Sequence, residues 1–498
     1  MRKLNKKQIG FVIGLVGFIF LSFFTNLDEN NKLISYTLGV TFLMATWWIL
    51  EVAPLAITAL FPIFLFPILN IADGKIISSA YFNDIIFLFI GGFMLALAMQ
   101  KWNLHTRIAL SILRKTGISP SRIILGFIIA TAFLSMWISN TATTMMMIPI
   151  AISILSELEE IFSKKDMKKY SIALLLAIAY SSSIGGIATL VGTAPNMVFV
   201  KTLAISFPNA PEISFGQWLI FAFPLSIMLL VIMFVFLYLV FFKNIKLSDT
   251  SGTSLIIEKQ YNNLGKINYE EKIVLILFIL FAGLLLFRKD ILIGDIRING
   301  WSNIFNSPKY LNDGTIAIFI GVLMYIIPSR NIKNNYILDW ETTKKMPWEI
   351  IILFGGGFAL ATGFVSSGLS LWIGNEISNI ISHNYLINII IVTTVMIFLT
   401  EVTSNTATTQ ILLPVIGAIA VSADNNPMLL MIPATIAASM AFMLPVATPP
   451  NAIVFGSGKI KISEMAKTGL VLNIIAIIVI SLFVWIIGID TFAIDMTK

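Results

Sequence analysis

The six residues SNTATT occur twice, at 139–144 and at 404–409, and each copy interrupts a long apolar stretch. These stretches, 123–156 and 385–420, are too long for one membrane crossing, which needs about 20 residues. We therefore expect each stretch to fold as a re-entrant hairpin with the polar SNT sequence at its tip.

The repetition reaches beyond these two motifs. Pro149 matches Pro414 at the same offset of 265 residues as the SNT motifs, and a GGF triplet recurs at that offset as well. TAPN at 193–196 matches TPPN at 448–451 after a slightly shorter connection. Repetition at a nearly constant offset indicates two homologous halves.

Composition restricts the class of protein. Hydrophobic residues make up 57% of the chain and charged residues 12%, which excludes a soluble protein. No cysteine is present, so disulfides and thiolate metal sites are impossible, and His105 and His383 lie in no metal-binding motif. The net charge of +7 is better explained by the distribution of basic residues about a membrane than by nucleic acid, and we expect no nucleic-acid partner.

Hydropathy predicts an all-α polytopic membrane protein with about eleven transmembrane helices and two re-entrant hairpins. The first apolar stretch lacks a small-residue cleavage site, so we interpret it as a retained helix and not as a signal peptide. The expected spans are 8–25, 33–51, 53–70, 84–101, 171–200, 215–242, 272–287, 314–329, 348–366, 428–457 and 468–488.

The distribution of basic residues predicts the orientation. With a cytoplasmic N-terminus, 25 of the 33 Lys and Arg residues fall inside and eight outside, in agreement with the positive-inside rule. The C-terminus is then outside, and the protein is a multi-pass protein of the inner or plasma membrane. The outside residues are Lys32, Lys75, Lys201, Arg288, Lys289, Arg297, Lys309 and Lys498.

The same topology places the two hairpins on opposite faces, so the halves form an inverted-topology repeat. Inverted repeats with broken helices are typical of secondary transporters, whose binding site lies near the membrane midplane. We expect the second pair of breaks at Pro195 and at Pro449 with Pro450, because proline removes a backbone donor and unwinds a membrane helix.

The polar breaks are rich in neutral oxygens and contain no charge. Hydroxyl, amide and carbonyl oxygens suit a small alkali cation, and sodium is the obvious candidate. A helix that begins after each SNT would direct its positive dipole end toward the midplane and favour an anion. Because an anion without the cation would meet an uncompensated low-dielectric site, each ligand should raise the affinity for the other.

The paired SNT motifs, each followed by a Pro-Asn break, resemble the divalent anion/sodium symporter family. The resemblance covers essentially the whole chain and implies uptake of C4-dicarboxylates such as succinate, malate and fumarate with at least two sodium ions. It also implies a homodimer with scaffold and transport domains that work by an elevator-type mechanism. The scaffold would comprise 1–120 and 244–383, each ending in an amphipathic arm helix, and the transport domain 121–243 and 384–498.

The resemblance also implies particular site residues. The first sodium site would use Ser135, Ser139, Asn140 and Gly192, and the second Thr400, Thr403, Asn405 and Ala447. The substrate carboxylates would meet Asn140, Thr141, Thr193, Ser404, Asn405, Thr406 and Pro449.

Several alternatives stay open at this stage. A sodium-independent exchanger of the same fold is the nearest one, and an anion channel would need a continuous polar path that the clustered polar residues do not suggest. An intramembrane enzyme is a further alternative, but the sequence contains no evident nucleophile-base pair and no recognisable catalytic motif. Glu401 is an intramembrane carboxylate, for which a structural hydrogen-bonding role is favoured over a proton site because its counterpart is Met136.

Overall fold

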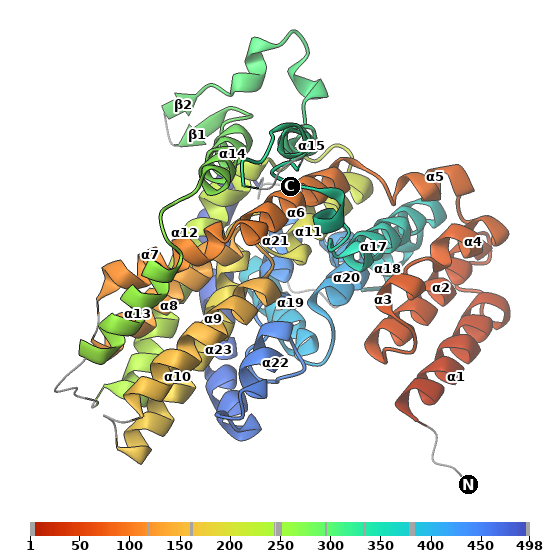
Figure 1. The fold of residues 1–498 in the computed structure, drawn as a ribbon. Helices are drawn as coiled ribbons and strands as arrows, with labels where there is room; N and C mark the ends of the chain where they lie inside the picture. Colours follow the sequence, from red (N-terminus) through yellow and green to blue (C-terminus); the bar gives the residue numbers. More distant parts are fainter. Residues whose placement is uncertain are drawn as a thin grey trace.

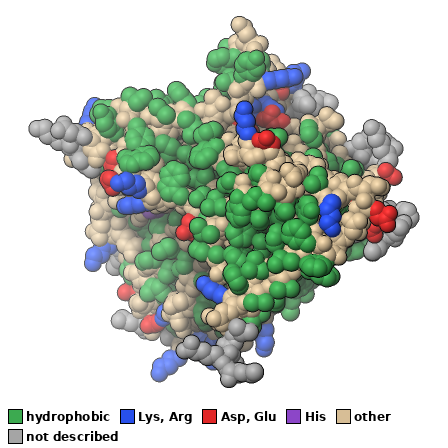
Figure 2. All heavy atoms as spheres, turned by 90° about the vertical axis from the view of Figure 1, so that its right-hand side faces the viewer, with side chains coloured by type: hydrophobic (Ala, Val, Ile, Leu, Met, Phe, Trp, Pro, Cys, Tyr) green, Lys and Arg blue, Asp and Glu red, His purple; other side chains and the backbone are tan. Residues whose placement is uncertain are grey.

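The computed structural model describes residues 5–117, 119–159, 163–243, 245, 251–293, 296–331, 335–377 and 384–494. Most of these residues form helices, and the first helix and a small β-hairpin lie at opposite ends of the molecule (Figure 1). The face shown in Figure 2 is covered by hydrophobic side chains over most of its middle, where charged side chains are sparse. Exposed apolar residues of the first helix include Phe11, Val12, Val16, Phe20 and Phe24. Such a surface is suited to lipid and not to water.

The described residues between 5 and 243 contain twelve α-helices. The first seven are α1 (Lys6–Ile19, continued as a π-helical turn to Phe24), α2 (Lys32–Ile49), α3 (Leu55–Thr58), α4 (Phe61–Ile68), α5 (Gly74–Ser79), α6 (Asp84–Lys101) and α7 (Leu104–Thr116). They are followed by α8 (Pro120–Ser135), α9 (Asn140–Leu158), α10 (Lys164–Gly186), α11 (Ala194–Ser206) and α12 (Phe215–Leu237).

The described residues after 243 also form long and short helices, together with two short strands. It forms α13 (Ser251–Asn263), α14 (Tyr269–Leu286), β1 (Ile291–Ile293), β2 (Ile296–Ile298), α15 (Asp313–Ile326), α16 (Trp340–Thr343), α17 (Trp348–Ser367) and α18 (Leu369–Ile377). The last helices are α19 (Tyr385–Thr400), α20 (Asn405–Ser422), α21 (Met428–Ala437), α22 (Pro449–Gly456), α23 (Ile462–Phe483) and α24 (Ile489–Thr491).

Within the described residues, seven helices are long and apolar enough to cross a membrane, and five further apolar helices are shorter. The mostly helical class is thereby confirmed, whereas the predicted number of eleven spans stays a prediction. The seven are Lys6–Phe24, Gly74–Lys101, Asn140–Leu158, Phe215–Phe242, Trp348–Ser367, Asn405–Ser422 and Ile462–Thr491.

Each of the two long apolar stretches is a pair of helices joined at the SNT sequence. Helix α8 ends at Ser135 and α9 begins at Asn140, while α19 ends at Thr400 and α20 begins at Asn405. The serine of each motif is the N-cap of the second helix. The short polar turn therefore ends one helix and starts the next, as expected of these residue types at a helix N-terminus.

The second pair of breaks differs from the expectation. Helix α10 ends at Gly186, well before Pro195, and α21 ends at Ala437, well before Pro449. The prolines lie in the first turns of α11 and α22, where the missing N–H has no partner to lose. The non-helical segments are therefore 187–193 and 438–448, and the prolines start new helices instead of unwinding old ones.

The arm helix predicted at 103–117 is present as α7, which packs against α8 and α13. Its Arg107 is buried and donates two hydrogen bonds to Glu271, both at 3.0 Å, in addition to bonds to the carbonyl groups of Leu264 and Gly265. The helix is thus anchored to the start of α14. Its predicted counterpart at 367–382 corresponds to α18, although residues 378–383, including His383, lie outside the described residues.

A β-hairpin that the sequence did not predict follows α14. Its two strands are antiparallel, with Ile291 opposite Ile298 and Ile293 opposite Ile296. The basic residues of this region are neutralised locally, because Arg288 pairs with Asp313 and Glu212 and Arg297 pairs with Asp290. These ion pairs explain how a region predicted to lie outside carries several cations.

Candidate functional site

The four polar segments converge on one cavity of about 440 Å³. They are the tips of the two hairpins and the ends of the two non-helical breaks, although they are far apart in the sequence. The lining that these segments contribute includes Ser139, Asn140, Thr141, Gly192, Thr193, Thr403, Ser404, Asn405, Thr406, Ala447, Thr448 and Pro449. Eleven of the thirteen site residues expected from the sequence are in this lining; the other two, Ser135 and Thr400, are fully buried behind it.

Ser135 holds the first hairpin tip against the last turns of α10, just before the first break. Its hydroxyl oxygen lies 2.6 Å from Oδ1 of Asn140 and 2.7 Å from the carbonyl oxygen of Ser182. One hydroxyl carries one proton, so it can satisfy only one of these two acceptors at a time. These three oxygens therefore have more acceptor lone pairs than the hydroxyl has protons to donate.

Thr400 makes the corresponding contacts in the second half. Its hydroxyl oxygen lies 2.6 Å from Oδ1 of Asn405 and 3.0 Å from the carbonyl oxygen of Ala438. Thr400 and Asn405 each follow their first-half counterparts, Ser135 and Asn140, by 265 residues. The two halves thus build the same arrangement of hydroxyl, amide and carbonyl oxygens.

Two glycines keep the first cluster open. A Cβ atom on Gly186 would lie 2.7 Å from Oδ1 of Asn140 and 3.1 Å from the carbonyl oxygen of Gly192. A Cβ atom on Gly192 would lie 2.4 Å from the carbonyl oxygen of Gly186. Oxygens from Asn140, Gly186 and Gly192 therefore lie around a space that the side chain of any larger residue at 186 or 192 would fill. Hard oxygen ligands of this kind suit an alkali cation.

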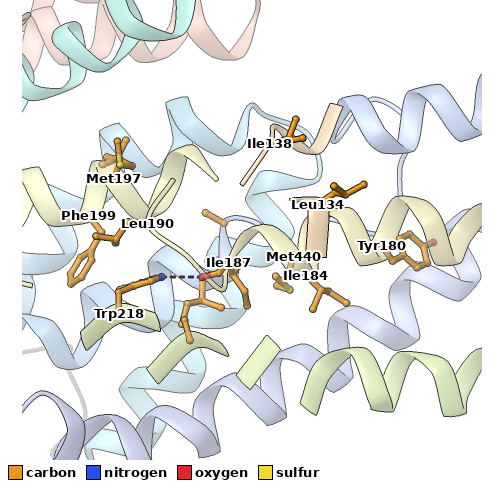
Figure 3. Packing of buried hydrophobic residues seen from close by; sticks show 14 of the residues in the cluster. Leu134, Ile138, Tyr180, Ile184, Ile187, Leu190, Met197, Phe199, Trp218 and Met440 are labelled. Atoms are coloured by element: carbon orange, nitrogen blue, oxygen red, sulfur yellow. Dashed lines mark hydrogen bonds between the residues drawn. The ribbon is translucent and has the colours of Figure 1, made fainter. Parts of the chain in front are cut away.

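The asparagines of TAPN and TPPN are fully buried and support the breaks from behind. Asn196 Nδ2 donates to the carbonyl oxygens of Ile187 at 3.1 Å and Thr189 at 2.8 Å. Asn451 Nδ2 donates in the same way to those of Ala441 and Leu444. Figure 3 shows that the carbonyl oxygen of Ile187 also accepts from the indole nitrogen of Trp218, at 3.0 Å. These bonds satisfy carbonyl groups that the interrupted helices leave without partners.

Four helices begin at the cavity. Ser139, Thr193, Ser404 and Thr448 are the N-caps of α9, α11, α20 and α22, and all four line it. Thr193 and Ser404 make no side-chain cap bond. The sequence predicted two such helix starts; the structure has four, so the positive ends of four helix dipoles and several N–H groups face the same space.

Charged groups are nearly absent from the cavity. Among the described residues that line it, only Lys6 and Glu51 are charged, and both come from the ends of the first two helices. Trp137 and Phe93 are further lining residues that the sequence reasoning missed. Apart from Lys6, the donors that the described lining offers to an anion are helix ends and neutral groups.

Glu401 does not line the cavity. It is 3% exposed, and its carboxylate accepts hydrogen bonds from the backbone of the second break and from Asn473. These contacts agree with the structural role expected from the sequence. His105, to which no role was assigned, donates from Nδ1 to the carbonyl oxygen of Met99, and its Nε2 contacts the hydroxyl of Thr106.

Nearly the whole chain is similar to known membrane transporters. The model of the sodium:sulfate symporter transmembrane region matches residues 6–489. The sodium-dependent dicarboxylate transporter SdcS of Staphylococcus saprophyticus is 42% identical over 495 residues, covering 98% of this chain and 93% of that protein. SdcS of Staphylococcus aureus is 43% identical over 493 residues, covering 97% and 92%.

Two solved transporter structures share the fold at 13% sequence identity. Neisseria gonorrhoeae MtrF superimposes with a TM-score of 0.55 over 84% of this chain and 86% of its own. Alcanivorax borkumensis YdaH does so with a TM-score of 0.53 over 82% and 86%. The family match and the identities above decide the classification: the chain belongs to the sodium:sulfate symporter family, whose members are membrane transporters and not enzymes.

Proposed function

We propose that this protein couples sodium entry to the uptake of C4-dicarboxylates such as succinate, malate and fumarate. The observation that carries the proposal is the cavity in which two oxygen clusters and four helix N-termini meet, with Lys6 the one basic residue among its described lining residues. The names of the relatives from Staphylococcus support both the ion and the substrate class.

The oxygen clusters are proposed as the sodium sites. Each has a hydroxyl whose one proton is shared between two acceptor oxygens, so a cation would bind lone pairs that no hydrogen now satisfies. The first site would use Ser135, Ser139, Asn140 and Gly192, and the second Thr400, Thr403, Asn405 and Ala447.

The dicarboxylate is proposed to lie between the hairpin tips. Its carboxylates would meet Asn140, Thr141, Thr193, Ser404, Asn405, Thr406 and Pro449, beside the N-termini of α9, α11, α20 and α22. Asn140 and Asn405 would then contact both a cation and the substrate. Bound sodium would add positive charge beside the carboxylates. By linkage, substrate and sodium would strengthen each other's binding by the same factor.

Transport is proposed to follow an elevator-type alternation. The scaffold would comprise 1–120 and 244–383 and the transport domain 121–243 and 384–498, in a homodimer within the lipid bilayer. The cavity is bordered by Lys6 at the predicted cytoplasmic end, so the described arrangement would be the one open to the cytoplasm. The predicted inverted repeat would allow this alternation. If the two halves exchanged their conformations, the site would open to the other side of the membrane.

The test is uptake of labelled succinate into proteoliposomes under an inward sodium gradient, with potassium in its place, and with unlabelled dicarboxylate preloaded. We expect concentrative, saturable uptake that requires sodium. Uptake that ignores sodium but needs internal dicarboxylate would make the protein an exchanger, and uptake that does not saturate would indicate a channel. Either result would overturn the proposal.

A further inference from the structure

Glu401 is a buried carboxylate at the tip of the second hairpin that the proposed site does not use. Oε1 accepts hydrogen bonds from the backbone N–H of Phe442 at 2.8 Å and of Met443 at 2.9 Å. Oε2 accepts from the N–H of Leu444 at 3.1 Å, and Asn473 Nδ2 donates to Oε1 at 2.7 Å. Among the ion pairs of the described residues, none includes Glu401. Four N–H donors therefore compensate the burial of this carboxyl group.

The three amides belong to consecutive residues of the non-helical break. Because α21 ends at Ala437, their N–H groups have no helical acceptors, and the carboxylate replaces those acceptors. The carbonyl groups of the same residues are bound from the other side: Tyr180 donates to that of Phe442 and Asn451 to that of Leu444. The turn is thus held through both its donors and its acceptors.

This turn leads directly to the second oxygen cluster. The N–H of Ala447, a proposed sodium ligand, donates to the carbonyl oxygen of Leu444 at 3.2 Å. Thr400, the residue before Glu401, contacts the carbonyl oxygen of Ala438 at the other end of the break. Two neighbouring residues of the hairpin therefore fix the start and the middle of the break that would face the cation.

The first half achieves the same connection without a charge. Met136 occupies the position of Glu401, and its backbone carbonyl accepts from the hydroxyl of Thr189. That hydroxyl in turn accepts from the N–H of Gly192 at 3.0 Å. The neutral Thr189 thus links the hairpin to the break in the first half, as the acidic Glu401 does in the second half.

We propose that Glu401 is a positioning residue for the second sodium site. It holds residues 442–444 so that Ala447 and Ala438 present their carbonyl oxygens beside Thr400 and Asn405. Its removal should weaken sodium binding at this site and leave the donors to the dicarboxylate in place. The inference rests on the proposed function, because it assumes that the cluster around Thr400 binds sodium.

The test compares Glu401→Gln with a matched variant of the same helix, Thr393→Val. Thr393 is also fully buried, but its hydroxyl bonds only to the carbonyl of Ile389, one turn back. A Gln amide would set an NH₂ group against one of the backbone N–H donors and remove the charge. Loss of charge-assisted hydrogen bonds of this kind corresponds to about a tenfold rise in the sodium concentration for half-maximal uptake.

The readouts are the sodium requirement for uptake, the succinate KM at saturating sodium, and the sodium-dependent rise in thermal unfolding temperature of the purified protein. We expect Glu401→Gln to raise the sodium requirement in both sodium assays while succinate KM changes little, and Thr393→Val to change neither. Asn473→Ala removes one of the four donors and should act in the same direction more weakly, which provides a second variant if Glu401→Gln fails to fold.

An unchanged sodium requirement in both Glu401→Gln and Asn473→Ala would overturn the inference, as would an equal rise in Thr393→Val. If uptake by the unmodified protein needs no sodium, the proposed function itself fails. The unmodified protein thus distinguishes a failure of the proposed function from a failure of the inference about Glu401.

Discussion

Asn140 and Asn405 are the residues on which the proposed mechanism depends most. Each amide oxygen contacts a buried hydroxyl at 2.6 Å, and each side chain lines the cavity. We predict that Asn140→Ala and Asn405→Ala each raise the sodium requirement and the succinate KM, by about tenfold or more for a lost ligand to a charged group. Uptake kinetics at varied sodium and succinate would measure both effects. An unchanged sodium dependence in both variants would remove these residues from the cation sites.

Gly186 provides a second test at the residue scale. Alanine there would place its Cβ 2.7 Å from Oδ1 of Asn140, inside the oxygen cluster. We predict that Gly186→Ala strongly reduces sodium-stimulated thermal stabilisation and uptake. Gly283→Ala is the matched control, because nothing lies within 4 Å of its Cβ position and alanine favours a helix. Equal behaviour of the two variants would contradict the predicted first site.

Much of the site could be predicted at this scale, and what was missed has a physical reason. The SNT and Pro-Asn motifs identified the segments that line the cavity, because polar residues within apolar stretches stand out in the sequence. The carbonyl groups of Ser182, Gly186 and Ala438 could not be predicted, since any residue type offers a backbone oxygen and only the fold brings it to the site.

At the scale of elements, the two breaks are supported by buried asparagines. Asn451→Leu keeps the size of the side chain but leaves the carbonyl oxygens of Ala441 and Leu444 without this donor. An unsatisfied buried polar group costs about 1–3 kcal/mol, so we predict a lower thermal unfolding temperature and a loss of transport. Asn426→Leu is a suitable control, because its side chain accepts only from the nearby N–H of Met428. The prediction fails if both variants unfold at the same temperature.

The helices themselves were largely predictable, and their ends were less so. Apolar length and the SNT turns predicted both hairpins, with α8, α9, α19 and α20 close to the expected ranges. The breaks were placed at prolines, whereas the helices end several residues earlier at Gly186 and Ala437. Their positions depend on tertiary bonds from Asn196, Asn451 and Glu401, which a local sequence pattern does not contain.

At the scale of the whole molecule, a few ion pairs join segments that the sequence assigns to different predicted domains. Among the described residues, those that join a predicted transport segment to a predicted scaffold segment are Lys201 with Asp84, at 2.7 Å, and Glu212 with Arg288 and Lys289. All lie on the side predicted to be outside, opposite the cavity mouth at Lys6. Burial raises the pKa of the Glu212 carboxyl, but Lys289 and Arg288 outweigh it and leave the pKa below its usual value, so the group is charged at neutral pH.

These pairs should stabilise the arrangement that is open at Lys6, because they would have to break when the transport domain moves. We predict that Asp84→Asn and Lys201→Gln each lower the population of the arrangement open at Lys6. The exchanged pair, Asp84→Lys with Lys201→Asp, should restore that population. The chain contains no cysteine, so Val446→Cys, at an exposed cavity position, offers a background-free site for an impermeant maleimide. Labelling from the N-terminal side should fall in the single variants and recover in the exchanged one. Equal labelling of all forms would show that the pairs do not favour either arrangement.

The central claim is that sodium completes the site for the dicarboxylate, and the most direct measurement is their reciprocal effect on binding. Succinate affinity of the purified protein would be measured at low and high sodium, and sodium affinity with and without succinate, with potassium keeping the ionic strength constant. The account predicts that sodium strengthens succinate binding and that succinate strengthens sodium binding by the same factor. Succinate binding of equal strength in potassium and in sodium would contradict it.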